Sequence, residues 1–118
     1  MFENVITPKR GEIWNVIFSN AIGCQQAGER PAVIVLNDKS NIYSPIVTVC
    51  PLTSKMKKNP AHVYLSDYVN CGLKEPSTIL VEQTTSINKF QMKQRIGTLS
   101  DNKQRLLNRK IMFQLIKS

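Results

Sequence analysis

The sequence has few of the residues that most catalytic and metal sites use. Among 118 residues there are one histidine, three cysteines and eight Asp+Glu. A single imidazole excludes mechanisms that need two of them, and scarce carboxylates argue against a metal cluster. Cys24, Cys50 and Cys71 are odd in number, lie far apart and lack the spacing of a zinc site or a disulfide framework. We therefore expect a reduced protein that needs no cofactor.

Long apolar runs and nucleotide-binding motifs are missing as well. Every apolar run is far shorter than the about 20 residues of a membrane-spanning helix, and residues 1–8 do not have the pattern of a secretion signal. The patterns GxGxxG, GxxxxGK[ST] and GxSxG do not occur. The chain is expected to be a single cytoplasmic domain, residues 1–118, with no membrane partner.

Basic residues, in contrast, are abundant. Sixteen Lys+Arg give a formal charge of +8, which favours a polyanionic partner such as nucleic acid. The densest basic cluster is Lys55, Lys57 and Lys58, directly after Thr53 and Ser54. These lysines would follow a nucleic-acid backbone if their loop borders a site, and they would otherwise form an ordinary solvated surface.

Short apolar segments separated by turn signals predict a small antiparallel barrel with short helices. In the first strand, 12–18, Trp14, Val16 and Phe18 share one face. Pro51 is expected to end the pairing of its strand or to place it at an edge. Residues 37–41 are expected to form a turn, 66–76 an irregular connection and 88–90 one helical turn. The further strands are expected at 32–36, 45–52, 62–65, 77–81 and 95–98.

The two ends of the chain differ from this pattern. Residues 1–8 read as an N-terminal arm, and a helix is predicted over 101–117 with Ser100 as its N-cap. The apolar residues of this helix cover more of its surface than packing on one barrel face requires. A second contact surface, such as a subunit partner, would account for them. They are Leu106, Leu107, Ile111, Met112, Phe113, Leu115 and Ile116.

Arg30 stands between a flexible loop, 23–29, and the apolar strand 32–36. Pro31 fixes its own φ and disfavours the helical region for Arg30, so the guanidinium is expected at the mouth of the strand with a fixed direction. The planar guanidinium suits a phosphate or carboxylate because it binds two oxygens at once. A surface arginine paired with Glu29 or Glu82 is the alternative.

An arginine with neighbouring hydroxyl groups can support RNA cleavage without a metal ion. The ribose 2′-hydroxyl is a built-in nucleophile, so a protein needs only to align it, stabilise the phosphoryl oxygens and assist proton transfer. Thr53 and Ser54 supply hydroxyls, although either could instead hold a turn. His62, the one histidine, lies beside Val63 in an expected strand and is read as structural.

Five blocks of the sequence resemble, in order, those of the MazF/PemK family of toxin endoribonucleases. They are RGEIW (10–14), GCQQAGERPAVIV (23–35), PLTSK (51–55), EQ (82–83) and IGTL (96–99). The resemblance implies an SH3-like antiparallel β-barrel with a C-terminal α-helix, assembled as a homodimer. It also implies metal-independent cleavage of single-stranded RNA (mRNA) at short sequences, leaving 2′,3′-cyclic phosphate and 5′-OH ends. An acidic, MazE-like antitoxin is the implied protein partner.

The same resemblance assigns roles to residues. Arg30 matches the family's catalytic arginine, and Thr53 the threonine that completes the site. Gln25 and Thr85 depart from the family's pattern, where many members have glutamate and arginine, and this affects the expected base preference and rate. Glu82 fits a base-reading or a structural role equally. The residues expected to bind RNA are Gln25, Glu29, Ser54, Lys55, Lys57, Lys58, Glu82 and Gln83.

A non-catalytic reading stays open. The same barrel could bind RNA or a protein without cleaving anything, including as a toxin directed at a topoisomerase. A protein-directed module has no need of a phosphate clamp, so Arg30 and Thr53 count against it. Cleavage of a long RNA distinguishes the two readings.

Overall fold

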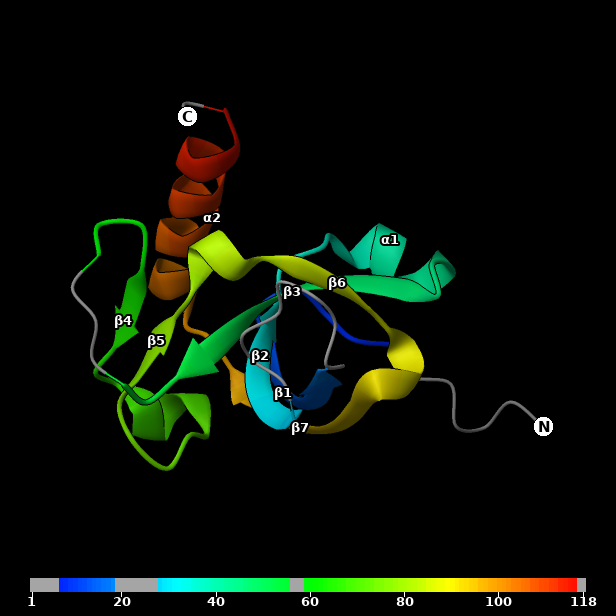
Figure 1. Cartoon of the computed structure of the whole chain (residues 1–118), viewed down its shortest axis with the longest axis horizontal. Coiled ribbons are helices and arrows are strands. Elements are labelled where there is room, and N and C mark those ends of the chain that lie inside the picture. The colour runs from blue at the N-terminus through cyan, green and yellow to red at the C-terminus, as the bar shows by residue number, and fades with distance from the viewer. Residues whose placement is uncertain (1–6, 19–27, 56–58, 117–118) are drawn as a thin grey trace.

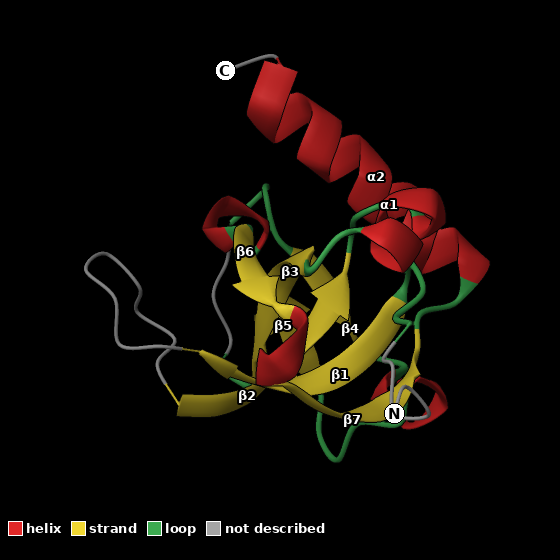
Figure 2. Ribbon diagram, turned by 90° about the vertical axis from the view of Figure 1, so that its right-hand side faces the viewer, coloured by secondary structure: helices red, strands yellow, loops and turns green. Residues whose placement is uncertain are grey.

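The computed structural model describes residues 7–18, 28–55 and 59–116, and its strands form a curled, antiparallel seven-stranded sheet (Figures 1 and 2). The mainly β architecture with short helices and a C-terminal helix agrees with the prediction from sequence. The strands are β1 Glu12–Phe18, β2 Gly28–Ile34, β3 Ile46–Thr53, β4 Val63–Leu65, β5 Ser77–Ile79, β6 Thr85–Asn88 and β7 Met92–Thr98. The helices are α1 Asp38–Tyr43 and α2 Asp101–Ile116, with 3-10 turns η1 Tyr68–Cys71, η2 Val81–Gln83 and η3 Lys89–Gln91.

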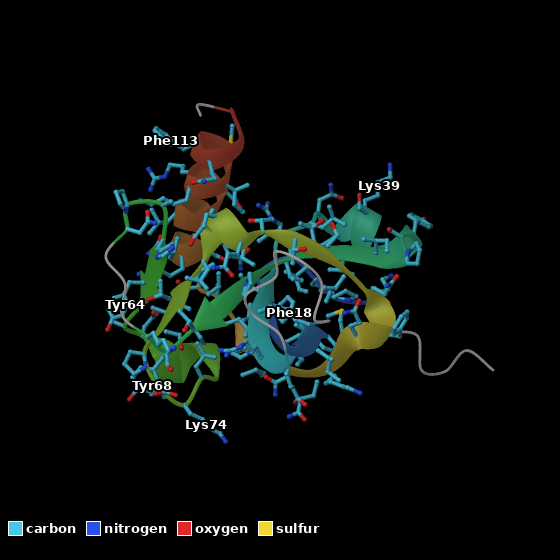
Figure 3. All side chains as sticks on the ribbon, in the orientation of Figure 1. Phe18, Lys39, Tyr64, Tyr68, Lys74 and Phe113 are labelled. Atoms are coloured by element: carbon cyan, nitrogen blue, oxygen red, sulfur yellow. The ribbon has the colours of Figure 1, made fainter. Side chains whose placement is uncertain are left out.

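Both faces of the sheet carry a cluster of buried apolar side chains. Successive side chains of a strand point to opposite faces, so residues of β1 contribute to both clusters. Ile13 of β1 belongs to a core cluster that also includes Leu107 of α2. Val16 and Phe18 belong to a second cluster with Ala32 and residues of β3, β6 and β7. Phe18 lies inside the ring of strands (Figure 3). The strand predicted over 12–18 is confirmed, since β1 has these bounds.

The long strand β3 connects the two halves of the sheet. On one side it pairs with β2. On the other side it pairs first with β6, up to Val49, and then with β5, from Leu52. Pro51 falls between these two partners, and its carbonyl accepts a hydrogen bond from Leu80 N at 2.9 Å. The expectation that Pro51 ends the pairing is correct for β2, whose pairing with β3 stops at Pro51. The strand itself continues to Thr53, because β3 pairs with β5 from Leu52 onward.

Two other segments differ from the expectation. The expected turn at 37–41 is the start of α1, where Asn37 Oδ1 caps the helix by accepting from Ser40 N at 2.9 Å. Strand β6 was not expected, because Ile87 is its one fully buried residue and its other side chains are polar. Its pairing with β3 compensates for this weak local pattern.

Helix α2 begins where the sequence predicted. Ser100 Oγ accepts from Lys103 N at 3.3 Å, as an N-cap does. Leu107 is buried, whereas Met112 and Phe113 are 59% and 66% exposed. The end of α2 extends away from the sheet (Figure 2). The side chains of Leu115 and Ile116 lie outside the described residues, as does most of the expected N-terminal arm. No helix in the described part of the chain is long and apolar enough to cross a membrane.

Candidate active site

The candidate site lies where β2 and β3 separate. Their pairing stops at Ala32 and Pro51. From there β2 continues along β1 to Gly28, and β3 continues along β5 to Thr53. Arg30 lies two residues before Ala32 and Thr53 two residues after Pro51, so they occupy matching positions on the diverging strands. The divergence leaves an opening between these two side chains.

A cavity of about 850 Å³ occupies this opening, a size typical of small-ligand sites. Arg30 and Thr53 both line it, together with Glu29 and Ser54. Further wall comes from β1, β7 and the segment between η1 and β5. Lys74 of that segment lies at the rim and points away from the strands (Figure 3). The complete lining is Asn15, residues 28–31, 52–54, 72–75, Ser77 and residues 94–96.

Arg30 is held differently from the expectation. It was expected at the mouth of a strand, but it lies inside β2, directly opposite Val16 of β1. Pro31, opposite Asn15, is tolerated inside the strand because pairing between β2 and β3 begins only at Ala32. Arg30 is therefore fixed by the β1 ladder on one side and half-buried beside the cavity on the other.

Thr53 combines the two roles that the sequence left open. It is 7% exposed and lines the cavity. Its Oγ1 also accepts from Lys55 N at 3.2 Å, which holds the turn after β3. Ser54 lines the cavity as an exposed residue, while Lys55 is exposed next to it and does not line it.

Other predicted RNA-binding residues are not brought into this cavity. Glu82 and Gln83 lie in η2 and do not line it. Glu82 Oε1 is instead 2.7 Å from Nε2 of His62, whose side chain is only 4% exposed. The carboxylate of Glu82 is thus engaged with a buried side chain, that of His62. Gln25, Lys57 and Lys58 lie outside the described residues.

The thiol of Cys50, close to Glu82 and His62, is unreactive. It is completely buried, and its Sγ is 3.1 Å from the hydroxyl of Thr84. Burial raises the pKa of Cys50 to about 11, with a smaller contribution from the charge of Glu82. The thiol is protonated at neutral pH, which fits packing rather than nucleophilic chemistry.

Several cavity residues were not predicted from the sequence. Asn15, Lys74, Gln94 and Arg95 belong to segments that are distant along the chain and meet only in the folded sheet. None of them carries a local motif. Among residues 7–18, 28–55 and 59–116, no three His, Cys, Asp or Glu side chains form a group suited to a metal ion.

Comparison with known proteins extends these observations. Residues 9–115 match the family model described as "PemK-like, MazF-like toxin of type II toxin-antitoxin system". The chain belongs to this family. A protein named Endoribonuclease MazF, from Staphylococcus saprophyticus, is 35% identical over 109 residues, covering 91% of this chain and 90% of the relative.

Solved structures share the fold. MazF from Deinococcus radiodurans superposes with a TM-score of 0.80 at 21% identity, over 93% of this chain and 97% of that one. A mycobacterial endoribonuclease in complex with its cognate antitoxin gives a TM-score of 0.74 at 17% identity, over 92% and 94%. At these identities the likeness supports the curled-sheet fold with its C-terminal helix.

Proposed function

We propose that this chain is the toxin of a toxin-antitoxin pair and a sequence-specific endoribonuclease that cleaves single-stranded RNA, such as mRNA, without a metal ion. The observation that carries the proposal is the placement of Arg30 and Thr53 on the two diverging strands of one cavity. Membership in the toxin family and the 35% identical relative named an endoribonuclease support it.

The chemistry follows from the groups available. The ribose 2′-hydroxyl attacks the adjacent phosphorus, a 2′-O–P bond forms, and the P–O5′ bond breaks. Arg30 donates hydrogen bonds to the phosphoryl oxygens, where negative charge develops, and assists transfer of the 2′-hydroxyl proton to the departing 5′ oxygen. Thr53 Oγ1 supplies a further hydrogen bond at the opposite wall. The products are a 2′,3′-cyclic phosphate and a 5′-hydroxyl.

This proposal is tested by incubating the purified protein with a long, structure-poor RNA in excess EDTA and mapping the fragment ends. We expect discrete cuts at a short common sequence, with 2′,3′-cyclic phosphates on the upstream fragments. DNA of the same sequence is expected to stay intact because it lacks the 2′-hydroxyl. Intact RNA across several unrelated substrates would favour a non-catalytic binding module instead.

The remaining RNA-binding residues are proposed to extend the site along the strand. Glu29 and Ser54 border the cavity itself, and Lys55 lies next to it. Gln25, Lys57 and Lys58 are proposed to bind RNA on the basis of the sequence alone, as is Gln83, whereas the contact of Glu82 with His62 favours the structural role for that carboxylate. The formal charge of +8 complements both RNA and an acidic, MazE-like antitoxin, and we propose such an antitoxin as the protein partner.

A homodimer is proposed from the surface of α2. Met112 and Phe113 expose apolar side chains at the end of the helix that extends away from the sheet. Burying them against a second copy removes this apolar surface from water.

Phe113→Asp is accordingly expected to weaken self-association at least about tenfold, because it places a charge in the buried contact. Light scattering at micromolar concentration should give twice 13.4 kDa for the unchanged protein and a shift toward 13.4 kDa for the variant. Tyr43→Asp, at a residue that is 79% exposed on α1, is the control and should leave the mass unchanged. A mass of 13.4 kDa for the unchanged protein would contradict the dimer.

A further inference from the structure

One wall of the cavity carries polar side chains that the proposed cleavage step does not use. Asn15 of β1 lies directly opposite Gln94 of β7, and Arg95 follows Gln94. All three residues line the cavity that contains Arg30. Directly opposite residues in an antiparallel pair have neighbouring side chains on the same face. The wall therefore presents two carboxamides side by side, and Arg95, which lies opposite Trp14, is the next residue along β7.

The pairing between β1 and β7 is irregular at this wall. The register shifts once between Ile13 and Trp14 and again between Asn15 and Val16, so the pairs that include Gln94 and Arg95 lie between two irregularities. Gln94, Arg95 and Ile96 all line the cavity, while the guanidinium of Arg95, whose partner in β1 is Trp14, reaches Thr98 and Glu12. Bulges of this kind redirect side chains and are frequent beside functional sites.

Arg95 is oriented but not buried. Its Nη1 is 3.3 Å from Thr98 Oγ1 and 3.9 Å from Glu12 Oε2, and its side chain is 54% exposed. Glu12 is itself fixed, because its Oε1 accepts from Trp14 Nε1 at 3.0 Å. An ion pair at 3.9 Å whose guanidinium is largely exposed contributes little stability. An incoming phosphate can therefore compete for this guanidinium at low cost.

We propose that Asn15, Gln94 and Arg95 form the subsite for a nucleotide next to the scissile phosphate of single-stranded RNA. Arg95 binds a phosphate of that nucleotide, and the two carboxamides hydrogen-bond its base edge. This inference rests on the proposed RNA cleavage. Carboxamides present a donor and an acceptor together, which is the pattern that distinguishes one base from another.

The position of the wall fits a neighbouring nucleotide rather than the scissile phosphate. Arg30 is on β2, and β1 lies between β2 and β7 in the sheet. Two strand spacings of about 4.8 Å separate the β2 and β7 backbones. Apolar side chains of Leu73 and Ile96, which pack against the core and line the same cavity, supply a surface for the flat face of a base.

Binding is tested with a short RNA that contains the mapped cleavage site and a 2′-deoxy substitution at the attacking ribose, so that it binds but is not cut. Fluorescence anisotropy should show that Arg95→Ala weakens binding about 5- to 50-fold. It should also reduce the slope of log K against log salt by about 0.7, the value for one phosphate contact on a single strand. The matched control is Lys93→Ala, which removes the same charge from an exposed residue of β7 outside the cavity lining and should change binding less than twofold.

Base reading is tested by mapping cut sites in a randomised RNA. Asn15→Asp and Gln94→Glu keep the side-chain shape but replace a donor with an acceptor, and Gln94→Ala removes the exposed amide altogether. Each is expected to change the preference at one position beside the cut by about tenfold, while the other positions keep theirs. Thermal melting of each variant checks that the fold is kept. If Asn15→Asp lowers the melting temperature, the Gln94 variants test base reading on their own, because Gln94 is exposed.

The outcomes separate the subsite from the proposed function. A wild-type protein that does not cut RNA refutes the function. A wild-type protein that cuts RNA, together with Asn15, Gln94 and Arg95 variants that bind equally well and keep the same cleavage sequence, overturns the subsite and leaves the function intact.

Discussion

Arg30→Ala is expected to lower the rate of RNA cleavage by at least about a thousandfold. Removing one preorganised donor to a developing oxyanion typically costs 10²–10³ in rate, and loss of assisted proton transfer adds to this. The fold should be kept, because Arg30 is half-buried and is held by the backbone ladder between β1 and β2 rather than by its side chain. Single-turnover cleavage of an RNA carrying the mapped site measures the rate, and circular dichroism checks the fold.

Two further variants define what Arg30 contributes. Arg30→Lys keeps the charge but loses the planar pair of donors, so we expect a rate between those of the wild type and the alanine variant. Arg105→Ala removes a charge from the exposed face of α2, where its Nη2 contacts Asn102, and should cleave at the wild-type rate. An Arg30→Ala rate within tenfold of the wild type would refute the assignment and favour the binding-module reading.

The elements that could be predicted are those whose structure is determined by residues close together in the sequence. The alternation along 12–18 predicted β1 to the residue, and the Ser100 cap with the apolar spacing beyond it predicted α2. Strand β6 was missed because Thr85, Ser86 and Asn88 have no apolar pattern; pairing with β3 makes it a strand. The surroundings of Pro51 were not predictable either. Pro51 lies between the segments of β3 that pair with β6 and with β5, and this pairing depends on residues far away in the sequence.

The site was predictable only where a motif carried it. Arg30 and Thr53 were singled out from the sequence, and the structure brings both to one cavity. The wall formed by Asn15, Gln94 and Arg95 was not, because it depends on the register of β1 against β7. A motif can also mislead. Glu82 lies in a block that resembles the family, but the sequence does not reveal that its carboxylate is engaged with His62.

Gly97→Ala is expected to have the largest effect on stability, because β7 and the end of η1 approach each other backbone to backbone. A methyl group at Gly97 would lie 1.9 Å from the carbonyl oxygen of Cys71, and one at Gly72 would lie 2.3 Å from the carbonyl oxygen of Ile96. Neither oxygen belongs to a flexible side chain, so the strand or the turn must move. We expect a loss of about 3 kcal/mol or more in the free energy of unfolding, at the upper end for overpacking. Urea denaturation measures it.

The control separates this contact from backbone conformation. Gly28 has a φ of +94°, but a methyl group there would meet nothing within 4 Å, so Gly28→Ala should cost only the about 1–2 kcal/mol of a left-handed residue. Gly97 has no positive φ, and its whole penalty therefore comes from the clash. The wall that Gly72 and Ile96 contribute to the cavity rests on this contact, so a folded Gly97→Ala protein should also bind RNA more weakly. A loss below about 1 kcal/mol, with unchanged RNA affinity, would mean that β7 and η1 separate easily and that the glycine contact does not fix the cavity wall.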